Sequence, residues 1–137
     1  MQNIDISKLV TDALLVMGCD RELISDLDSH SDIVLDFHHF PSIHLARDGD
    51  DIRLWAALGE RHDYRRLIDA HAPQLLQELM PAQPCARGGS LMMSIQDETM
   101  QLSTLVHPEY LADSEKFSEA LNEFFARLGV FKQIVGA

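Results

Sequence analysis

Three histidines, His38, His39 and His44, are the side chains whose type and spacing come closest to a metal-binding or reactive site. Neutral imidazole is the commonest protein ligand for transition metals. Adjacent strand residues point to opposite faces, so His38 and His39 cannot both bind one ion unless the chain bends at Phe40-Pro41. The spacing also lacks the paired short-range ligands of structural zinc. We therefore expect solvated histidines and no metal. A small ligand- or metal-binding module or enzyme built on these histidines is the alternative hypothesis.

Asp28, Ser29 and His30 are the residue types of a hydrolytic triad, but consecutive side chains do not easily adopt its relayed geometry. Turn and capping roles suit them better. The sequence contains no GxSxG, HExxH, phosphate-loop or dinucleotide-binding fingerprint. The pair Gly88-Gly89 precedes an expected strand instead of opening a helix, so it cannot hold a phosphate at a helix N-terminus. We expect a protein that is not an enzyme and needs no cofactor.

The composition is that of one soluble domain spanning residues 1–137. Hydrophobic residues make up 46% of the chain and charged residues 24%, and the net charge is −11 at pH 7. That charge argues against a nucleic-acid partner, because binding to phosphates relies on Lys and Arg. It also disfavours an anionic membrane surface.

Features that would place the chain outside a reducing cytoplasm are missing from the sequence. Cys19 and Cys85 lie far apart and have no CxxC spacing, so we expect two free thiols. The N-terminus has no basic region ahead of an apolar core, and no apolar run approaches the roughly 18 residues of a membrane span. We expect a cytoplasmic protein without membrane insertion.

An opening helix is predicted over Ile6–Met17, with Asp5 as its N-cap and Gly18 as its stop. Its apolar positions cover more of the helical wheel than the stripe of about 100° that a surface helix needs. The excess predicts a second apolar contact beyond the helix's own sheet. A helix sunk more deeply in the core is the equal alternative.

The segment from Asp26 to Phe37 changes from polar, cap-forming residues to an alternating strand. Its odd-numbered residues from Ile33 to Phe37 share one face, and Val34 is the single apolar residue on the other. Strands over Ser42–Arg47 and Ile52–Leu58 follow, joined by a hairpin turn at residues 48–50.

The remaining segments complete the order of elements. Residues 59–69 are ambiguous, with a helical turn around 64–68, and a short helix is predicted to start at Pro73 and run to Met80. Its leucines cover more than one side, so a second copy of the chain is the natural cover. A hairpin over Ser90–Gln96 and Thr99–Val106 follows, and then a helix over Ser114–Phe131 capped by Asp113.

The predicted fold class is α+β, an antiparallel sheet with helices on one side in the order α-β-β-β-α-β-β-α. Four stretches stand out within these elements: Ile6–Gly18, the segment SDLDSHS at 25–31 leading into Ile33, the strand Leu54-Trp55-Ala56, and LNEFFAR at 121–127. Through them the sequence resembles the class I chaperones of bacterial type III secretion, most closely the class IB subgroup of the invasion protein B and SpaK type. Residues 59–89 depart most from the family pattern.

The resemblance implies an acidic homodimer in the bacterial cytoplasm without enzymatic activity. It implies binding of the N-terminal part of one or several secreted effector proteins, which wraps around the dimer in extended form, is able to add a strand to the sheet, and is kept ready for secretion. The sequence does not name the effectors or decide whether the chain also contacts the secretion ATPase.

Residues were assigned to these two contacts from the apolar surplus described above. The predicted effector-binding residues are Val10, Leu14, Ile33, Leu35, Phe37 and Trp55. The predicted dimer residues are Leu75, Leu76, Leu79 and Leu91. A place in the protein's own core is the alternative for each apolar position, because regularly spaced apolar residues are usually just buried. For Trp55, which points away from the Leu54 face, the alternative is packing against a neighbouring helix or a second subunit.

Overall fold

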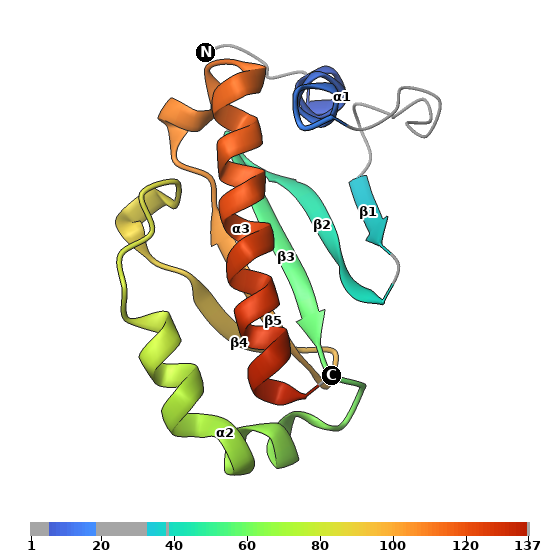
Figure 1. Ribbon diagram of the computed structural model, residues 1–137, viewed down its shortest axis with the longest axis vertical. Coiled ribbons are helices and arrows are strands. Elements are labelled where there is room, and N and C mark those ends of the chain that lie inside the picture. Colours follow the sequence, from blue (N-terminus) through green and yellow to red (C-terminus); the bar gives the residue numbers. More distant parts are fainter. Residues whose placement is uncertain (1–5, 19–32, 38, 137) are drawn as a thin grey trace.

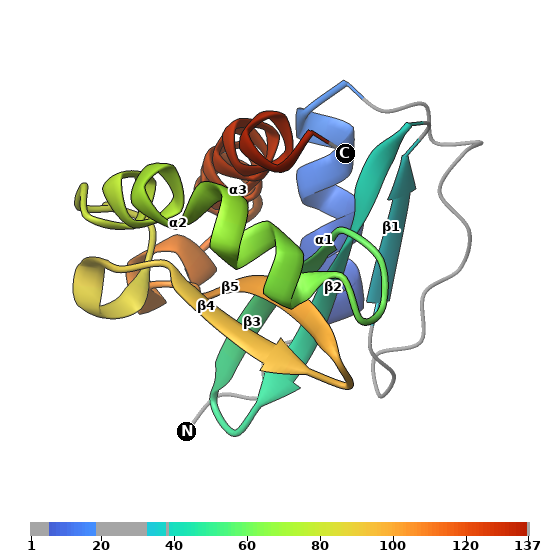
Figure 2. The same cartoon turned by 90° about the horizontal axis from the view of Figure 1, so that it is seen from below.

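Five antiparallel strands form a single sheet in the part of the chain that the computed structural model describes, which is residues 6–18, 33–37 and 39–136. The elements are α1 (Ile6–Val16), β1 (Ile33–Phe37), β2 (Phe40–Asp48), β3 (Asp51–Leu58), α2 (Tyr64–Leu79), η2 (Arg87–Gly89), β4 (Met92–Gln96), β5 (Thr99–Leu105), η3 (Pro108–Leu111) and α3 (Ser114–Val135). Figure 2 shows α1, α2 and α3 on the same side of the sheet. The α+β class, the order of helices and strands and the one-sided packing are confirmed.

The strand order is β1-β2-β3-β5-β4, so the chain crosses the sheet once between β3 and β4 and places β1 at an edge. Alternation assigns the two faces. Leu45, Leu54 and Leu102 are fully buried under the helices, whereas the residues between them point to the other face. Figure 2 shows no helix of the described chain over that second face. We call it the outer face.

The core lies between the sheet and α3, which runs along the length of the molecule (Figure 1). Phe117, Phe124, Leu128 and Phe131 are almost completely buried and recur at helical spacing. Asp113 caps the helix as predicted, because its side chain accepts a hydrogen bond from the Lys116 backbone amide at 2.8 Å. The helix extends four residues beyond the predicted end at Phe131.

Helix α1 packs its buried face against α3 and ends close to the predicted stop. Gly18 adopts a φ of 92°, and its amide hydrogen-bonds the Leu15 carbonyl at 3.1 Å. Glycine suits this position because other residues enter left-handed backbone only with strain. The predicted cap, Asp5, lies outside the described residues, as does the polar segment 26–32.

The prediction for α2 was wrong about its start. The helix begins at Tyr64, so Pro73 lies in its interior rather than in its first turn. Proline removes the hydrogen bond to the carbonyl four residues earlier and clashes with it, which bends a helix without necessarily ending it. Figure 1 shows α2 changing direction along its length. The ambiguous segment 59–69 is therefore a short loop followed by the first turns of α2.

The two hairpins are confirmed, with small differences in strand ends. Strand β2 begins at Phe40 and β4 at Met92, compared with the predicted starts at Ser42 and Ser90. At the turn between β4 and β5, Asp97 and Glu98 both have positive φ, 50° and 61°. Such a two-residue turn follows the twist of the strands that it joins.

Candidate functional site

An apolar groove lies where α1, the β1–β2 hairpin and α3 meet. It has a volume of about 180 Å³ and is lined by Leu14, Met17, Leu35, Phe37, Ile43, Leu121, Asn122 and Phe125. We call it the rim groove. Among the described residues that line it, Asn122 is the one polar side chain, so this lining suits apolar side chains and offers one amide as a hydrogen-bonding group.

Three phenylalanines form an aromatic cluster at the rim groove. The rings of Phe40 and Phe125 are stacked, with centroids 4.4 Å apart and planes inclined by 26°. Phe37 meets both rings edge-on, at 5.9 Å from Phe40 and 5.2 Å from Phe125. Phe37 and Phe125 remain 37% and 38% exposed. Rings held by each other and still open to solvent form a preorganised surface for a further apolar group.

The predicted effector-binding residues separate into two groups at this groove. Leu14, Leu35 and Phe37 line it. Val10 and Ile33 are 0% and 3% exposed and belong to the core. A partner cannot reach these two side chains in the structure of the single chain, so their contact with an effector stays a prediction.

Five further lining residues were missed by the sequence reasoning: Met17, Ile43, Leu121, Asn122 and Phe125. One sequence signal could have found Phe125. Phe124 already occupies the core stripe of α3, and an adjacent helical residue lies about 100° away, so a second phenylalanine there must point to another surface. Ile43 gives no such signal, because it shares its face of β2 with the core residue Leu45.

Trp55 lies on the outer face, opposite to the rim groove. Its ring is stacked on His44, with centroids 3.8 Å apart and planes inclined by 8°. The register places His44, Trp55 and Ser103 side by side across three strands. The expectation that Trp55 points away from Leu54 is confirmed, and its contact with an effector stays a prediction.

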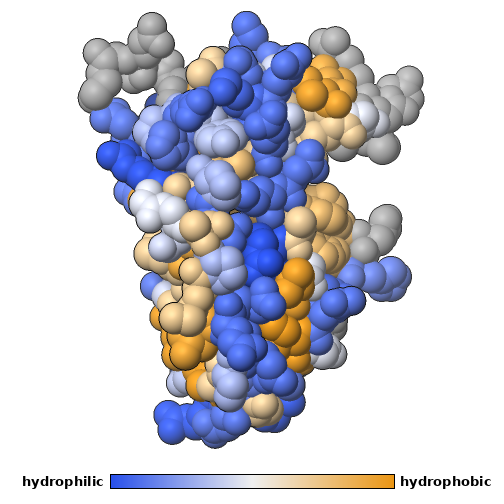
Figure 3. Space-filling model, turned by 60° about the vertical axis from the view of Figure 1, so that its left-hand side comes forward, coloured by the Kyte–Doolittle hydropathy of each residue, from blue (hydrophilic) through white to orange (hydrophobic). Residues whose placement is uncertain are grey.

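A second, larger groove lies between α2 and the β4–β5 hairpin. It has a volume of about 410 Å³ and is lined by Ile68, Ala72, Leu75, Leu76, Leu79, Met93, Ser94, Ile95 and Met100. We call it the α2–β4 groove. Leu76 is 59% exposed, and Met80, just beyond the end of α2, is 75% exposed. Figure 3 turns the α2 side toward the viewer and shows apolar surface in the lower half of the molecule, on both sides of a hydrophilic strip.

Three of the four predicted dimer residues line this groove. Leu76 is exposed, Leu79 is half-buried, and Leu75 forms part of the floor at 4% exposure. Leu91 does not line the groove. It lies in the core, next to a small cavity below α3.

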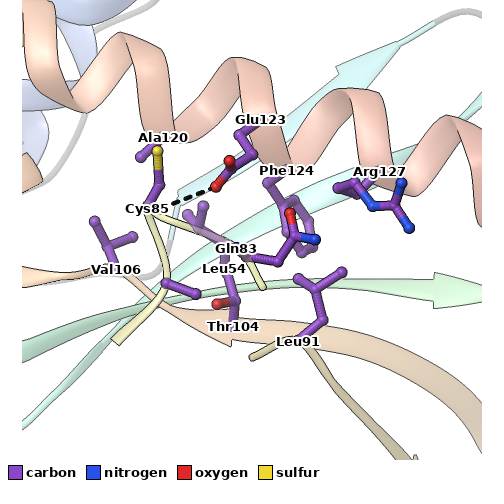
Figure 4. A pocket seen from close by; sticks show the side chains of 11 residues that line it. Leu54, Gln83, Cys85, Leu91, Thr104, Val106, Ala120, Glu123, Phe124 and Arg127 are labelled. Atoms are coloured by element: carbon purple, nitrogen blue, oxygen red, sulfur yellow. Dashed lines mark hydrogen bonds between the residues drawn. The ribbon is translucent and has the colours of Figure 1, made fainter. Parts of the chain in front are cut away.

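That small cavity, shown in Figure 4, has a volume of about 10 Å³, which is room for about one water molecule and no larger ligand. Glu123 accepts a hydrogen bond from the Cys85 backbone amide at 3.1 Å. Burial and the Glu123 carboxylate together raise the pKa of the Cys85 thiol to about 11. The thiol is therefore protonated at neutral pH and is a poor nucleophile.

The histidines that suggested a metal site do not converge in the part of the chain that is described. His44 is engaged with Trp55, and His39 is exposed at the turn before β2 with a φ of 56°. His38 lies outside the described residues. Over residues 6–18, 33–37 and 39–136, no group of three or more His, Cys, Asp or Glu side chains could hold a metal ion. In the same residues, no helix is long and apolar enough to cross a membrane.

Comparison with known proteins identifies the family. The model of the invasion protein B family matches residues 18–97. The chain is 44% identical over 133 residues to the surface presentation of antigens protein SpaK of Salmonella typhimurium, and equally to that of Salmonella typhi, with 97% of each chain covered. The chain belongs to the invasion protein B family. The resemblance to type III secretion chaperones, drawn from the sequence, is thereby confirmed.

Solved structures share the fold of this invasion protein B family member at low sequence identity. One is a chain of the heterodimeric ExoU-SpcU complex from the type III secretion system of Pseudomonas aeruginosa. It has a TM-score of 0.59 and 20% identity, and the match covers 93% of this chain and 95% of that one. Another is a chain of the ExsC-ExsE complex, with a TM-score of 0.60, 14% identity and coverage of 98% and 97%.

Proposed function

We propose that this invasion protein B family member is a cytoplasmic, non-enzymatic chaperone for secreted effector proteins. It binds the N-terminal segment of one or more effectors in the rim groove and keeps that segment soluble and ready for secretion. The observation that carries the proposal is an open apolar groove next to an edge strand, in a chain of a type III secretion chaperone family.

The geometry supports binding of an extended segment. Strand β1 has one neighbouring strand among the described residues, so its other edge presents backbone amides and carbonyls that an added strand would pair. Leu35 and Phe37 of the same strand line the groove. An added strand would gain main-chain hydrogen bonds at the edge and would place alternate side chains over the groove.

The same proposal assigns the α2–β4 groove to a second copy of the chain. Apolar surface of this extent is seldom left in water by a soluble protein. Each copy brings the same groove, so two copies can cover each other through a symmetric contact. The rim groove involves α1, β1, β2 and α3, and the described residues that line it are all different from those that line the α2–β4 groove. Dimerisation and effector binding are therefore able to occur together.

Light scattering coupled to size-exclusion chromatography tests this function. The purified chain is measured alone and after co-expression with N-terminal segments of effector candidates. We expect a dimer alone, and a complex of two chains with one otherwise insoluble segment after co-expression. Leu14→Asp should abolish the complex and leave the dimer intact, because Leu14 lines the groove and is only partly buried.

The matched control is Thr11→Asp on the same helix, which adds the same charge one turn earlier at a position outside the groove lining. A stable monomer that retains no segment would contradict the proposal. Equal loss of the complex in both variants would assign the effect to α1 as a whole and not to the groove.

A further inference from the structure

We infer that the partner strand at β1 carries a lysine or arginine next to a bulky apolar residue, and that Asp36 selects this basic residue. The inference rests on the proposed function and specifies the chemistry of the segment that the rim groove binds. It follows from the alternation of β1 and from the surroundings of Asp36.

Side chains of β1 alternate between the two faces of the sheet. Leu35 and Phe37 point into the rim groove, so Val34 and Asp36 point to the outer face. The pairing with β2 shifts between Leu35 and Phe37, and the Ser42 hydroxyl donates a hydrogen bond to the Asp36 carboxylate across this irregularity. That bond holds the carboxylate on the outer face, beside the edge of β1 that pairs with no strand of the described residues.

Residues paired across two strands point to the same face. The partner residue opposite Leu35 therefore enters the rim groove, and the next residue toward Asp36 points outward beside its carboxylate. Opposite charges placed across two strands stabilise the pair, and like charges destabilise it. Among the described residues, no cationic side chain forms an ion pair with Asp36, so its charge is available to a partner.

The net charge of the whole chain also favours a positively charged partner residue. The net charge of the chain is −11, and the described residues that line the groove carry no charge. An apolar groove in a chain of negative net charge selects a partner through apolar contact first and through basic flanking residues second. The edge of β1 opposite β2, which no described strand pairs, favours an extended peptide over a helix, because only an extended backbone can pair with it.

A displayed library of random ten-residue peptides tests the inference directly. Four baits are compared: the wild-type chain, Asp36→Lys, Asp36→Asn, and the matched control Asp50→Lys, which changes the charge by the same amount as Asp36→Lys in the exposed turn between β2 and β3. We expect the wild type and Asp50→Lys to enrich peptides with alternating apolar residues and a Lys or Arg next to one of them. Asp36→Lys should enrich Asp or Glu at that position. Asp36→Asn, a smaller change, should remove the charge preference.

The strength of the charge preference is then measured with two synthetic peptides that differ only by Lys or Glu at the selected position. Fluorescence anisotropy should show the wild type binding the Lys peptide about two- to five-fold more tightly, and Asp36→Lys should reverse that order. The same consensus from all baits, or apolar residues spaced three and four apart as in a helix, would overturn the inference.

The two proposals fail in distinguishable ways. Co-purification of an effector segment together with peptides that show no charge preference, or with no enriched peptide, rejects the basic-residue rule and leaves the chaperone function standing. Neither co-purification nor any enriched peptide rejects both.

Discussion

Arg127 is the side chain that ties the two longest helices together. Its Nη2 donates to the Glu78 carboxylate at 2.6 Å and to the Glu78 backbone carbonyl at 2.8 Å, and its guanidinium lies 5.8 Å from the centre of the Phe131 ring. Glu78 is near the end of α2, where backbone carbonyls lack helical partners. One arginine of α3 therefore holds the C-terminal end of α2 against the core.

Replacing Arg127 by methionine should lower the free energy of unfolding by about 1–2 kcal/mol, because the Glu78 carbonyl and carboxylate lose a charged donor while the packing is largely kept. Urea denaturation followed by circular dichroism measures the change. Arg65→Met, which removes an exposed arginine of α2, is the control and should stay within about 0.5 kcal/mol. An equal loss in the two variants would contradict the role given to Arg127.

Cys85 should react slowly with iodoacetamide in a Cys19→Ser variant at pH 8. Because burial and Glu123 raise its pKa to about 11 from 9.0, the thiolate fraction falls roughly a hundredfold. Mass spectrometry over time gives the rate, and the urea-unfolded variant supplies the unprotected rate. Rapid labelling of the folded chain would contradict the raised pKa.

The raised pKa of Cys85 also makes the free energy of unfolding depend on pH. The folded state favours the protonated thiol, so the contribution of Cys85 is fully present below about pH 9 and is lost as the pH rises through about 11. Cys85→Ala in the Cys19→Ser background should weaken the decline of the unfolding free energy between these values.

At the level of elements, Gly59 fixes the junction between β3 and α2. Its φ is 76°, and a Cβ added there would lie 2.5 Å from Leu67 Cδ1. Leu67 is 1% exposed, so its side chain would have to shift within the core to make room. Gly59→Ala should therefore cost about 2–4 kcal/mol of unfolding free energy, from left-handed strain and overpacking together.

Gly49→Ala provides the matched control for this junction. It has a similar φ of 62°, but no atom within contact distance of the added Cβ. Only the strain should remain, about 1–2 kcal/mol. Thermal or urea unfolding of both variants separates the two contributions, and equal losses would show that contact with Leu67 is unimportant.

The order of elements could be predicted because each long segment has a clear period. The stripe from Phe117 to Leu128 and the alternation from Ile52 to Leu58 both match the structure. The first half of α2 could not be predicted in the same way. Its sequence is rich in charge, with Pro73 in the middle, and local rules favour a start at the proline. Burial of Leu67 in the core overrides that preference.

The rim groove was only partly predictable for a related reason. Periodicity shows which face of a helix or strand is apolar, but it does not show whether a second element covers that face. Val10 and Leu14 share a helical face in the sequence, yet Val10 is buried and Leu14 lines the groove. Phe125 of α3 reaches the groove only through tertiary packing against Phe37 of β1, which lies nearly ninety residues earlier in the sequence.

Across the whole molecule, the two grooves lie on different elements and join only through α3 and the sheet. This separation predicts that dimerisation can be removed without loss of the fold. Leu76→Asp should convert the dimer into a folded monomer, because Leu76 is 59% exposed in the single chain. Sedimentation velocity and circular dichroism measure mass and folding on the same sample.

Val16→Asp is the control for that variant, since Val16 is 52% exposed on α1 and remote from α2 in sequence and structure. It should remain dimeric. A monomer in both variants, or a dimer in both, would contradict the assignment of the α2–β4 groove to a second copy.

The stacked pair on the outer face gives the molecule an optical probe of its sheet. Trp55 is the single tryptophan in the sequence, and the His44 ring lies against it at 3.8 Å. Emission excited at the red edge of the absorption band therefore reports one site, on strands β2 and β3. A ligand confined to the helical side of the sheet does not touch the indole, whereas a partner on the outer face, or separation of those two strands, changes the surroundings of the ring. A titration that is silent in fluorescence but visible in light scattering would thus locate the partner on the helical side of the sheet.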